Sequence, residues 1–148
     1  MNDNYNEIME YLYIGNSKSF INNNFDLIVN CTKEYEVPFS TNNTSMNIRI
    51  SIKDDPYECD KFLSIINDTN VLDTINDYIT NKKTVLVHCS MGMQRSCALV
   101  TCYLIKYYNM DYIQAINFIK LKRPIAFFGN INLLSTIEKF FENFKKNQ

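Results

Sequence analysis

The sequence predicts an α/β fold, in which a central, mainly parallel sheet of about four to five strands is flanked by helices. The first observation is that short apolar runs, typical of buried strands, alternate along the chain with longer amphipathic segments that are typical of helices. The second is the length, because 148 residues is near the commonest size of one domain. We therefore expect residues 1–148 to form a single domain.

The expected elements follow one another without a linker, a repeat or a low-complexity segment. The strands are expected at about 10–15, 25–31, 47–52 and 84–88. Helices are expected at about 17–22 and 61–80, and three more after residue 95. Polar loops are expected at 33–46 and 53–60. Ile48, Ile50 and Ile52 alternate with polar residues, so at least one face of that strand is expected to be buried.

The most informative segment is the one that surrounds Cys89. An apolar run over 84–87 leads to this cysteine, a polar stretch that contains Gly92 follows, and helical periodicity begins after Arg95. A strand, a tight loop and a helix start direct backbone N–H groups at an anion, and the helix dipole adds partial positive charge. A cysteine in that field is expected to be a thiolate near neutral pH. The segment thus combines a nucleophile, an anion cradle and a fixed cation.

This segment resembles the signature His-Cys-x-x-x-x-x-Arg-Ser/Thr of the cysteine-dependent dual-specificity protein phosphatases, a family of the protein-tyrosine phosphatase superfamily. The resemblance extends to the family's first strand, second strand, third strand with acid loop, and helix ending in Arg-Pro, at residues 8–15, 25–32, 47–55 and 111–124. It therefore covers nearly the whole chain in the right order. It implies hydrolysis of phosphate monoesters on phosphotyrosine and phosphoserine or phosphothreonine, through a cysteinyl-phosphate intermediate.

The signature assigns a role to each of its side chains. Cys89 is expected to attack phosphorus in line, and the planar guanidinium of Arg95 to hold two phosphate oxygens. The resemblance implies that Ser96 hydrogen-bonds the Cys89 sulfur as it leaves in the second step, and that His88 orients the loop rather than moving protons. The expected phosphate-binding residues are Ser90, Met91, Gly92, Met93, Gln94 and Arg95.

The reaction also needs an acid for the leaving group, and the loop after the third strand offers Asp54, Asp55 and Asp60. In the resembling family the acid lies on this loop, often with a second acidic residue five places later, and Asp55 with Asp60 fits that pattern. Pro56 disfavours helix at Asp55 and holds it in an extended loop. We favour Asp55, while Asp54 and a merely solvated set of carboxylates stay open.

Cys31 is a candidate for redox control. It ends the second expected strand, and in a parallel sheet the loop that carries Cys89 lies at the same edge. The segment resembles the strand end where some members of the wider superfamily carry a cysteine that captures the oxidised nucleophile. The alternative is that Cys31 is a small buried apolar residue, as free cysteines usually are.

Composition favours an intracellular enzyme. The net charge of −1 predicts no general attraction to nucleic acid or to an anionic membrane. Five cysteines without framework spacing fit a reducing compartment, and no apolar run or leader segment predicts membrane insertion or secretion, so we expect a cytoplasmic location. No cofactor and no metal are expected, and the expected partner is a phosphoprotein substrate. The sequence predicts no oligomeric state.

The same residues bear on other functions. A phosphatase of RNA 5′ ends or of phosphoinositides would be better served by basic loop residues, whereas Ser90, Met91, Met93 and Gln94 are neutral. A non-catalytic phosphate-binding module would not need a cysteine, an arginine and a nearby aspartate together. A rhodanese-type sulfurtransferase has a shorter loop, and a low-molecular-weight phosphatase carries its loop near the N-terminus.

Overall fold

The computed structural model describes residues 3–42 and 44–148, so residue 43 of the expected polar loop at 33–46 lies outside the described residues. Within these residues the chain forms a five-stranded sheet of order β1-β2-β5-β3-β4. The strands are β1 (Tyr5–Met9), β2 (Leu12–Gly15), β3 (Leu27–Asn30), β4 (Met46–Arg49) and β5 (Val85–His88). Strand β1 is antiparallel to β2, and the other neighbours are parallel. The predicted fold class is therefore confirmed.

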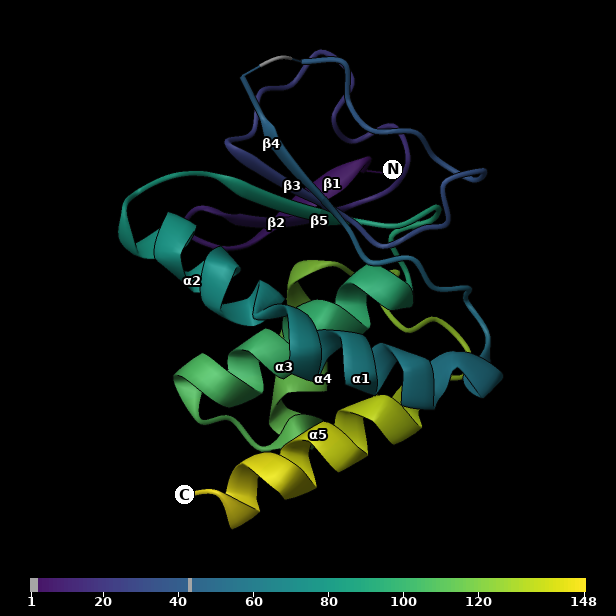
Figure 1. Cartoon of the computed structure of the whole chain (residues 1–148), viewed down its shortest axis with the longest axis vertical. Coiled ribbons are helices and arrows are strands. Elements are labelled where there is room, and N and C mark those ends of the chain that lie inside the picture. The colour runs from purple at the N-terminus through teal and green to yellow at the C-terminus, as the bar shows by residue number, and fades with distance from the viewer. Residues whose placement is uncertain (1–2, 43) are drawn as a thin grey trace.

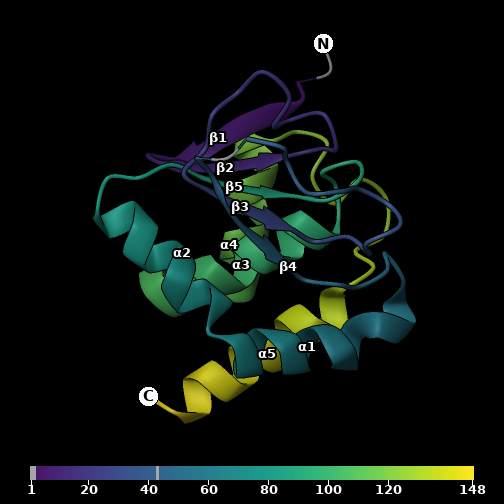
Figure 2. The same cartoon turned by 45° about the horizontal axis from the view of Figure 1, so that its top comes forward.

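The helices lie together on one side of this sheet (Figures 1 and 2). They are the short 3-10 helix η1 (Pro56–Glu58) and the α-helices α1 (Cys59–Thr69), α2 (Val71–Thr80), α3 (Arg95–Tyr108), α4 (Tyr112–Lys122) and α5 (Leu134–Lys146). The three helices expected after residue 95 are thus confirmed. None of the helices formed by residues 3–42 and 44–148 is long and apolar enough to cross a bilayer.

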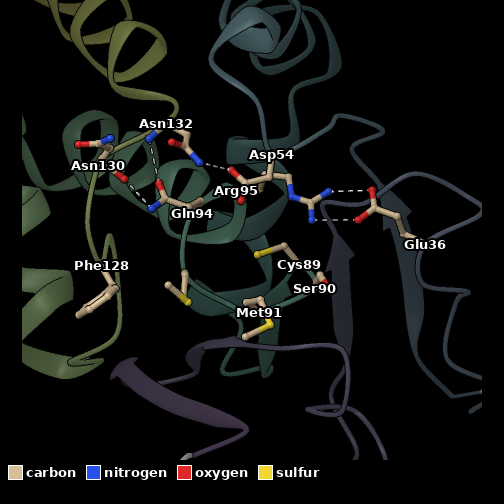
Figure 3. Close-up of a pocket in the computed structure, with 11 residues that line it drawn as sticks. Glu36, Asp54, Cys89, Ser90, Met91, Gln94, Arg95, Phe128, Asn130 and Asn132 are labelled. Atoms are coloured by element: carbon tan, nitrogen blue, oxygen red, sulfur yellow. Dashed lines mark hydrogen bonds and ion pairs between the residues drawn. The ribbon is translucent and has the colours of Figure 1, made fainter.

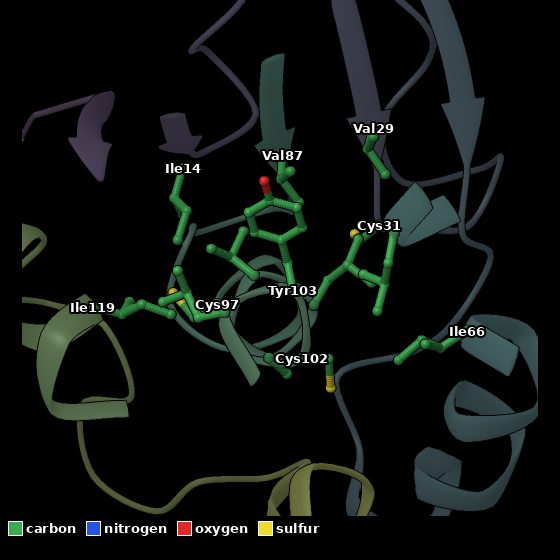
Figure 4. Close-up of a cluster of buried hydrophobic side chains, with 14 of the residues drawn as sticks. Ile14, Val29, Cys31, Ile66, Val87, Cys97, Cys102, Tyr103 and Ile119 are labelled. Atoms are coloured by element: carbon green, nitrogen blue, oxygen red, sulfur yellow. The ribbon is translucent and has the colours of Figure 1, made fainter. Parts of the chain in front are cut away.

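Strand β5 and helix α3 form the centre of the main core (Figure 4). Every residue of β5 is buried, and so are residues 95–105 of α3. Val87 of β5 and Tyr103 of α3 both belong to this core. A loop that joins two such elements has both ends fixed by close packing, which makes its geometry rigid.

The N-terminal part of the chain differs from the expected pattern. The segment expected as one strand at 10–15 is the second half of a hairpin, and β1 precedes it. Tyr11 makes the turn with φ 73°. The prediction of a short helix at 17–22 is wrong, because this segment forms turns. In the first of them Asn16 Oδ1 accepts a hydrogen bond from the Lys18 N–H at 2.9 Å. Asparagine side chains favour such turns over helix.

The long helix expected at 61–80 is divided in two. Asn70 adopts the left-handed conformation with φ 55°, which ends α1 and precedes α2. Asparagine is one of the few residues that tolerate this conformation. The strand expected at 47–52 also ends early, at Arg49, although Ile50 and Ile52 are buried as predicted.

Candidate active site

The loop between β5 and α3 has its carbonyl groups fixed from outside. The carbonyl of Ser90 accepts a hydrogen bond from the Ser17 N–H at 2.9 Å, and that of Met93 accepts one from the Phe127 N–H at 2.7 Å. Because the C=O and N–H of a planar peptide point in opposite directions, these contacts turn the following N–H groups to the other side of the loop. The N–H groups of residues 90–95 donate no hydrogen bond to any other described residue. They are therefore available to an anion at the N-terminus of α3.

Arg123 fixes the middle of the loop. Its guanidinium is fully buried, and its Nε donates to the carbonyl of Gly92 at 2.7 Å, while a second nitrogen donates to the carbonyl of Met91 at 3.4 Å. Gly92 itself has φ 68°, and a Cβ atom there would lie 2.6 Å from both Arg123 and the carbonyl oxygen of Gly15. Only glycine fits this conformation and this close approach.

The side chains of Cys89 and Ser96 lie in contact at the base of the loop. Cys89 Sγ is 3.1 Å from Ser96 Oγ, so a hydroxyl is in place to donate to the sulfur. His88 Nδ1 is 3.2 Å from the carbonyl oxygen of Cys89, which can only accept, so Nδ1 carries the proton. Burial lowers the pKa of His88 to about 4. His88 is therefore neutral, and its Nδ1–H donates to the backbone of the loop.

Arg95 is held by Glu36, a residue that the sequence did not single out (Figure 3). The two terminal nitrogens of Arg95 donate to the two carboxylate oxygens of Glu36 at 2.9 and 3.0 Å, and one of them also donates to the Ile52 carbonyl at 3.0 Å. These hydrogen bonds from Arg95 lower the pKa of Glu36. The Nε of Arg95 is buried and has no partner among the described residues, so it is left for an anion in the loop.

The three candidate acids lie in different surroundings. Asp54 lines the same pocket as Cys89, and its Oδ1 accepts a hydrogen bond from Asn132 Nδ2 at 2.9 Å. Asp55, which we favoured, does not line this pocket; as the residue that caps η1, it accepts the Tyr57 N–H at 2.8 Å. Asp60 forms an ion pair with Lys139 at 3.0 Å. Asp54, not Asp55, therefore shares a pocket with Cys89. Asp55 instead caps η1, which begins at Pro56.

The pocket has a volume of about 480 Å³ and contains most of the predicted site. It is lined by Glu36, Asp54, Cys89, Ser90, Met91, Met93, Gln94, Arg95, Phe128, Asn130 and Asn132. Arg95 is the single cationic residue among them. Met91 and Phe128 are 64% and 74% exposed, so large apolar side chains stand at the pocket's edge.

Cys31 and Cys89 follow the ends of two neighbouring parallel strands, β3 and β5. Asn30 of β3 pairs in register with His88 of β5, and Cys31 and Cys89 each follow by one residue. The Cys31 N–H donates to the His88 carbonyl at 2.8 Å. Burial raises the pKa of the Cys31 thiol, and the neighbouring charge of Cys89 raises it further. Cys31 is therefore a protonated thiol whose backbone lies beside that of Cys89.

Several residues at the site were missed by the sequence reasoning. Glu36, Asn132 and Arg123 reach the loop from positions 59, 38 and 31 residues away from their partners. One signal was available for Glu36, because it follows β3 and the carboxyl ends of parallel strands share an edge. For Asn132 no local pattern in the sequence indicates a role.

Comparisons with known proteins agree with this geometry. Residues 11–143 match the family model of the dual specificity phosphatase catalytic domain. The chain is 32% identical over 145 residues to "Putative tyrosine phosphatase 123R" of Invertebrate iridescent virus 6, with 93% of this chain and 94% of that protein covered. It is 31% identical over 147 residues to Protein phosphatase Slingshot of Drosophila melanogaster, covering 90% of this chain but 13% of that longer protein.

The fold is also similar to solved structures. The crystal structure of human DUSP28 superposes with a TM-score of 0.85 at 20% identity, covering 98% of this chain and 97% of that one. At this identity the likeness concerns the fold. The family model covers most of the chain, however, and the viral relative aligns over nearly its full length. This chain therefore belongs to the dual specificity phosphatase catalytic-domain family.

Proposed function

We propose that this chain hydrolyses phosphate monoesters on phosphotyrosine and on phosphoserine or phosphothreonine of proteins, through a cysteinyl-phosphate intermediate. The observation that carries the proposal is the loop at 89–95. It combines a sulfur within 3.1 Å of a hydroxyl donor, N–H groups that donate to no other residue in the described part of the chain, and a guanidinium fixed in one orientation. A mere phosphate-binding module needs no nucleophile, whereas here Cys89 stands at the base of the anion site.

In the first step, the Cys89 thiolate attacks phosphorus as the bond from phosphorus to the leaving oxygen breaks. The N–H groups of 90–95 and the Nε of Arg95 stabilise the charge on the phosphoryl oxygens. Asp54, protonated, donates its proton to the leaving oxygen, which departs as an alcohol or phenol.

In the second step, water attacks the phosphocysteine. The Asp54 carboxylate takes a proton from that water as the new phosphorus–oxygen bond forms. The sulfur–phosphorus bond breaks, and Ser96 stabilises the departing Cys89 thiolate from its position 3.1 Å away. Inorganic phosphate and the free enzyme result.

The charge of the pocket favours a singly phosphorylated residue over a polyphosphorylated substrate. Arg95 is the single cation of the lining, and Glu36 and Asp54 oppose it. A phosphoinositide or an RNA 5′ triphosphate would bring further phosphates near these carboxylates, which repel them. The apolar side chains of Met91 and Phe128 are instead suited to contacts with a peptide or an aromatic ring.

A substrate panel tests this function. Phosphate release is measured with phosphotyrosyl and phosphothreonyl peptides, a phosphoinositide and an RNA with a 5′ triphosphate, and kcat/KM is compared. We expect both peptides to be hydrolysed with a higher kcat/KM than either polyanion. A higher value for the phosphoinositide or the RNA would refute the protein substrate, and release from none of the four would refute hydrolysis itself.

We also propose that Cys31 protects the oxidised nucleophile. Peroxide oxidises the Cys89 thiolate to a sulfenic acid, and the Cys31 thiol then forms the disulfide with release of water. Neighbouring parallel strands lie about 4.7–4.9 Å apart, which is within the Cα separation of disulfides. After brief peroxide treatment we expect a Cys31–Cys89 peptide linkage and recovery of activity with a thiol reductant. Equal irreversible loss in wild type and in Cys31→Ala would contradict this role.

A reducing compartment such as the cytoplasm suits this chemistry. All five cysteines are free in the structure, and the mechanism requires Cys89 in its reduced form.

A further inference from the structure

We propose that Gln94 and Asn132 form a positioning relay that fixes Asp54, so that Oδ1 is the anchored oxygen and Oδ2 carries the transferred proton. The relay joins the phosphate loop to the acid through the segment at 130–132 (Figure 3). This inference rests on the proposed role of Asp54 as the general acid. It extends that role by naming the residues that act through Asp54.

The relay begins at Gln94, the last residue of the phosphate loop. Gln94 occupies the N-cap position of α3, yet its side chain forms no bond with the helix N–H groups. Its amide is nearly buried and lies against a backbone segment instead: Nε2 donates to the Asn130 carbonyl at 2.8 Å, and Oε1 accepts the Asn132 N–H at 3.0 Å. The two bonds fix the position of residue 132 relative to the phosphate loop, and they leave the helix N–H groups free for phosphate.

Asn132 is fixed from its other side as well. Its carbonyl accepts a hydrogen bond from Cys59 Sγ at 3.6 Å, and Cys59 begins α1. Asn132 thus lies between the phosphate loop and the helix that follows the acid loop. Hydrogen bonds from both elements fix its backbone, so the position of its Cα atom, from which the side chain extends, is fixed as well.

The side chain of Asn132 then selects one oxygen of the acid. Nδ2 donates to Asp54 Oδ1 at 2.9 Å. No other hydrogen bond to the Asp54 side chain exists within residues 3–42 and 44–148, and Asp54 is exposed. Without Asn132 this exposed carboxyl would rotate among several orientations. In a protonated carboxyl the oxygen that accepts the Asn132 donor is the carbonyl oxygen, so the proton is on Oδ2 and is directed to the leaving group.

The relay predicts a defect that depends on the leaving group. Asn132→Ala should lower kcat for a phosphoseryl peptide about tenfold, since misplacing a catalytic group by about 1 Å costs up to roughly 10²-fold. The same variant should change kcat little for 4-nitrophenyl phosphate, whose leaving group departs without a proton. Gln94→Met, which keeps the length of the side chain but removes both amide bonds, should show a smaller defect of the same kind.

A double-mutant cycle separates positioning from a structural role. If Asn132 acts only through Asp54, then Asn132→Ala should cause no further loss in an Asp54→Asn background. Asn143→Ala is the matched control, because this exposed asparagine of α5 lies outside the pocket that Cys89 and Asp54 line, and it should leave the ratio of the two rates unchanged. Melting temperatures show whether each variant is folded.

Each outcome decides between the possibilities. An equal loss on both substrates, or an undiminished loss in the Asp54→Asn background, would refute the relay while the proposed function stands. If Asp54→Asn itself shows no dependence on the leaving group, then the assignment of the acid fails and the relay falls with it. If Asn132→Ala and Gln94→Met both lose activity on both substrates and both have lowered melting temperatures, then residues 130–132 are only structural.

Discussion

Cys89→Ser is expected to abolish turnover while the fold and the binding of phosphate are retained. A serine hydroxyl has a pKa far above neutrality, so it does not replace a thiolate as the nucleophile. Its volume is similar, and the N–H groups of the loop and the Arg95 guanidinium do not depend on the sulfur for their positions. The measurement is phosphate release by the purified variant against a mock preparation, together with its melting temperature and its binding of inorganic phosphate.

Cys102→Ala provides the matched control for the nucleophile. Cys102 is fully buried in α3, and burial raises the pKa of its thiol, so it takes no part in the reaction. This variant should retain turnover at a modest cost in stability. Turnover of Cys89→Ser above the mock preparation would refute the phosphocysteine mechanism.

Asp54→Asn is expected to lower kcat by roughly 10²–10⁴ for a phosphoseryl or phosphothreonyl peptide, which is the usual contribution of a general acid. An amide has no proton of the required acidity to give to the leaving alkoxide. For 4-nitrophenyl phosphate the effect should be much smaller, because that leaving group is a stable anion. The measurement is kcat for each substrate with the variant and the wild type.

Asp55→Asn is the matched control for the acid. An asparagine side chain still offers an oxygen to the Tyr57 N–H, so the cap of η1 is retained. We therefore expect near wild-type kcat with both substrates. If the leaving-group dependence follows Asp55 instead of Asp54, the acid is the residue that the sequence favoured, and the pocket in its present form is not the catalytic one.

The different surroundings of Asp54 and Asp55 depend on long-range contacts. Asp54 and Asp55 are neighbours of the same chemical type, so no local pattern separates them. Asn132, 78 residues away from Asp54, hydrogen-bonds one of them, whereas the Tyr57 N–H occupies the other. The resemblance to a family predicts an acid on this loop, and how the loop packs against the segment at 130–132 determines which of the two carboxylates lines the pocket.

The ion pair that holds Arg95 also depends on a long-range contact. The spacing between Cys89 and Arg95 is local and is visible in the sequence, as is the strand–loop–helix pattern around them. The carboxylate that orients the guanidinium comes from Glu36, on a loop that follows a different strand. Its side chain is 26% exposed, whereas that of Arg95 is 5% exposed, so Glu36 lies nearer to the solvent than Arg95 does.

By itself, the sequence determined the α/β fold class, the strand β5, the loop that follows it and the helix α3, because these follow from local apolar periodicity and from a compact motif. The sequence did not predict the hairpin at Tyr11 or the helix break at Asn70, because a single left-handed residue hardly changes the apolar periodicity of a segment. Only the tertiary structure decided that Asp54, Glu36 and Asn132 line one pocket with the loop that carries Cys89. The physical reason is that these contacts join segments brought together by the sheet order and by helix packing, and neither is encoded in the spacing of neighbouring residues.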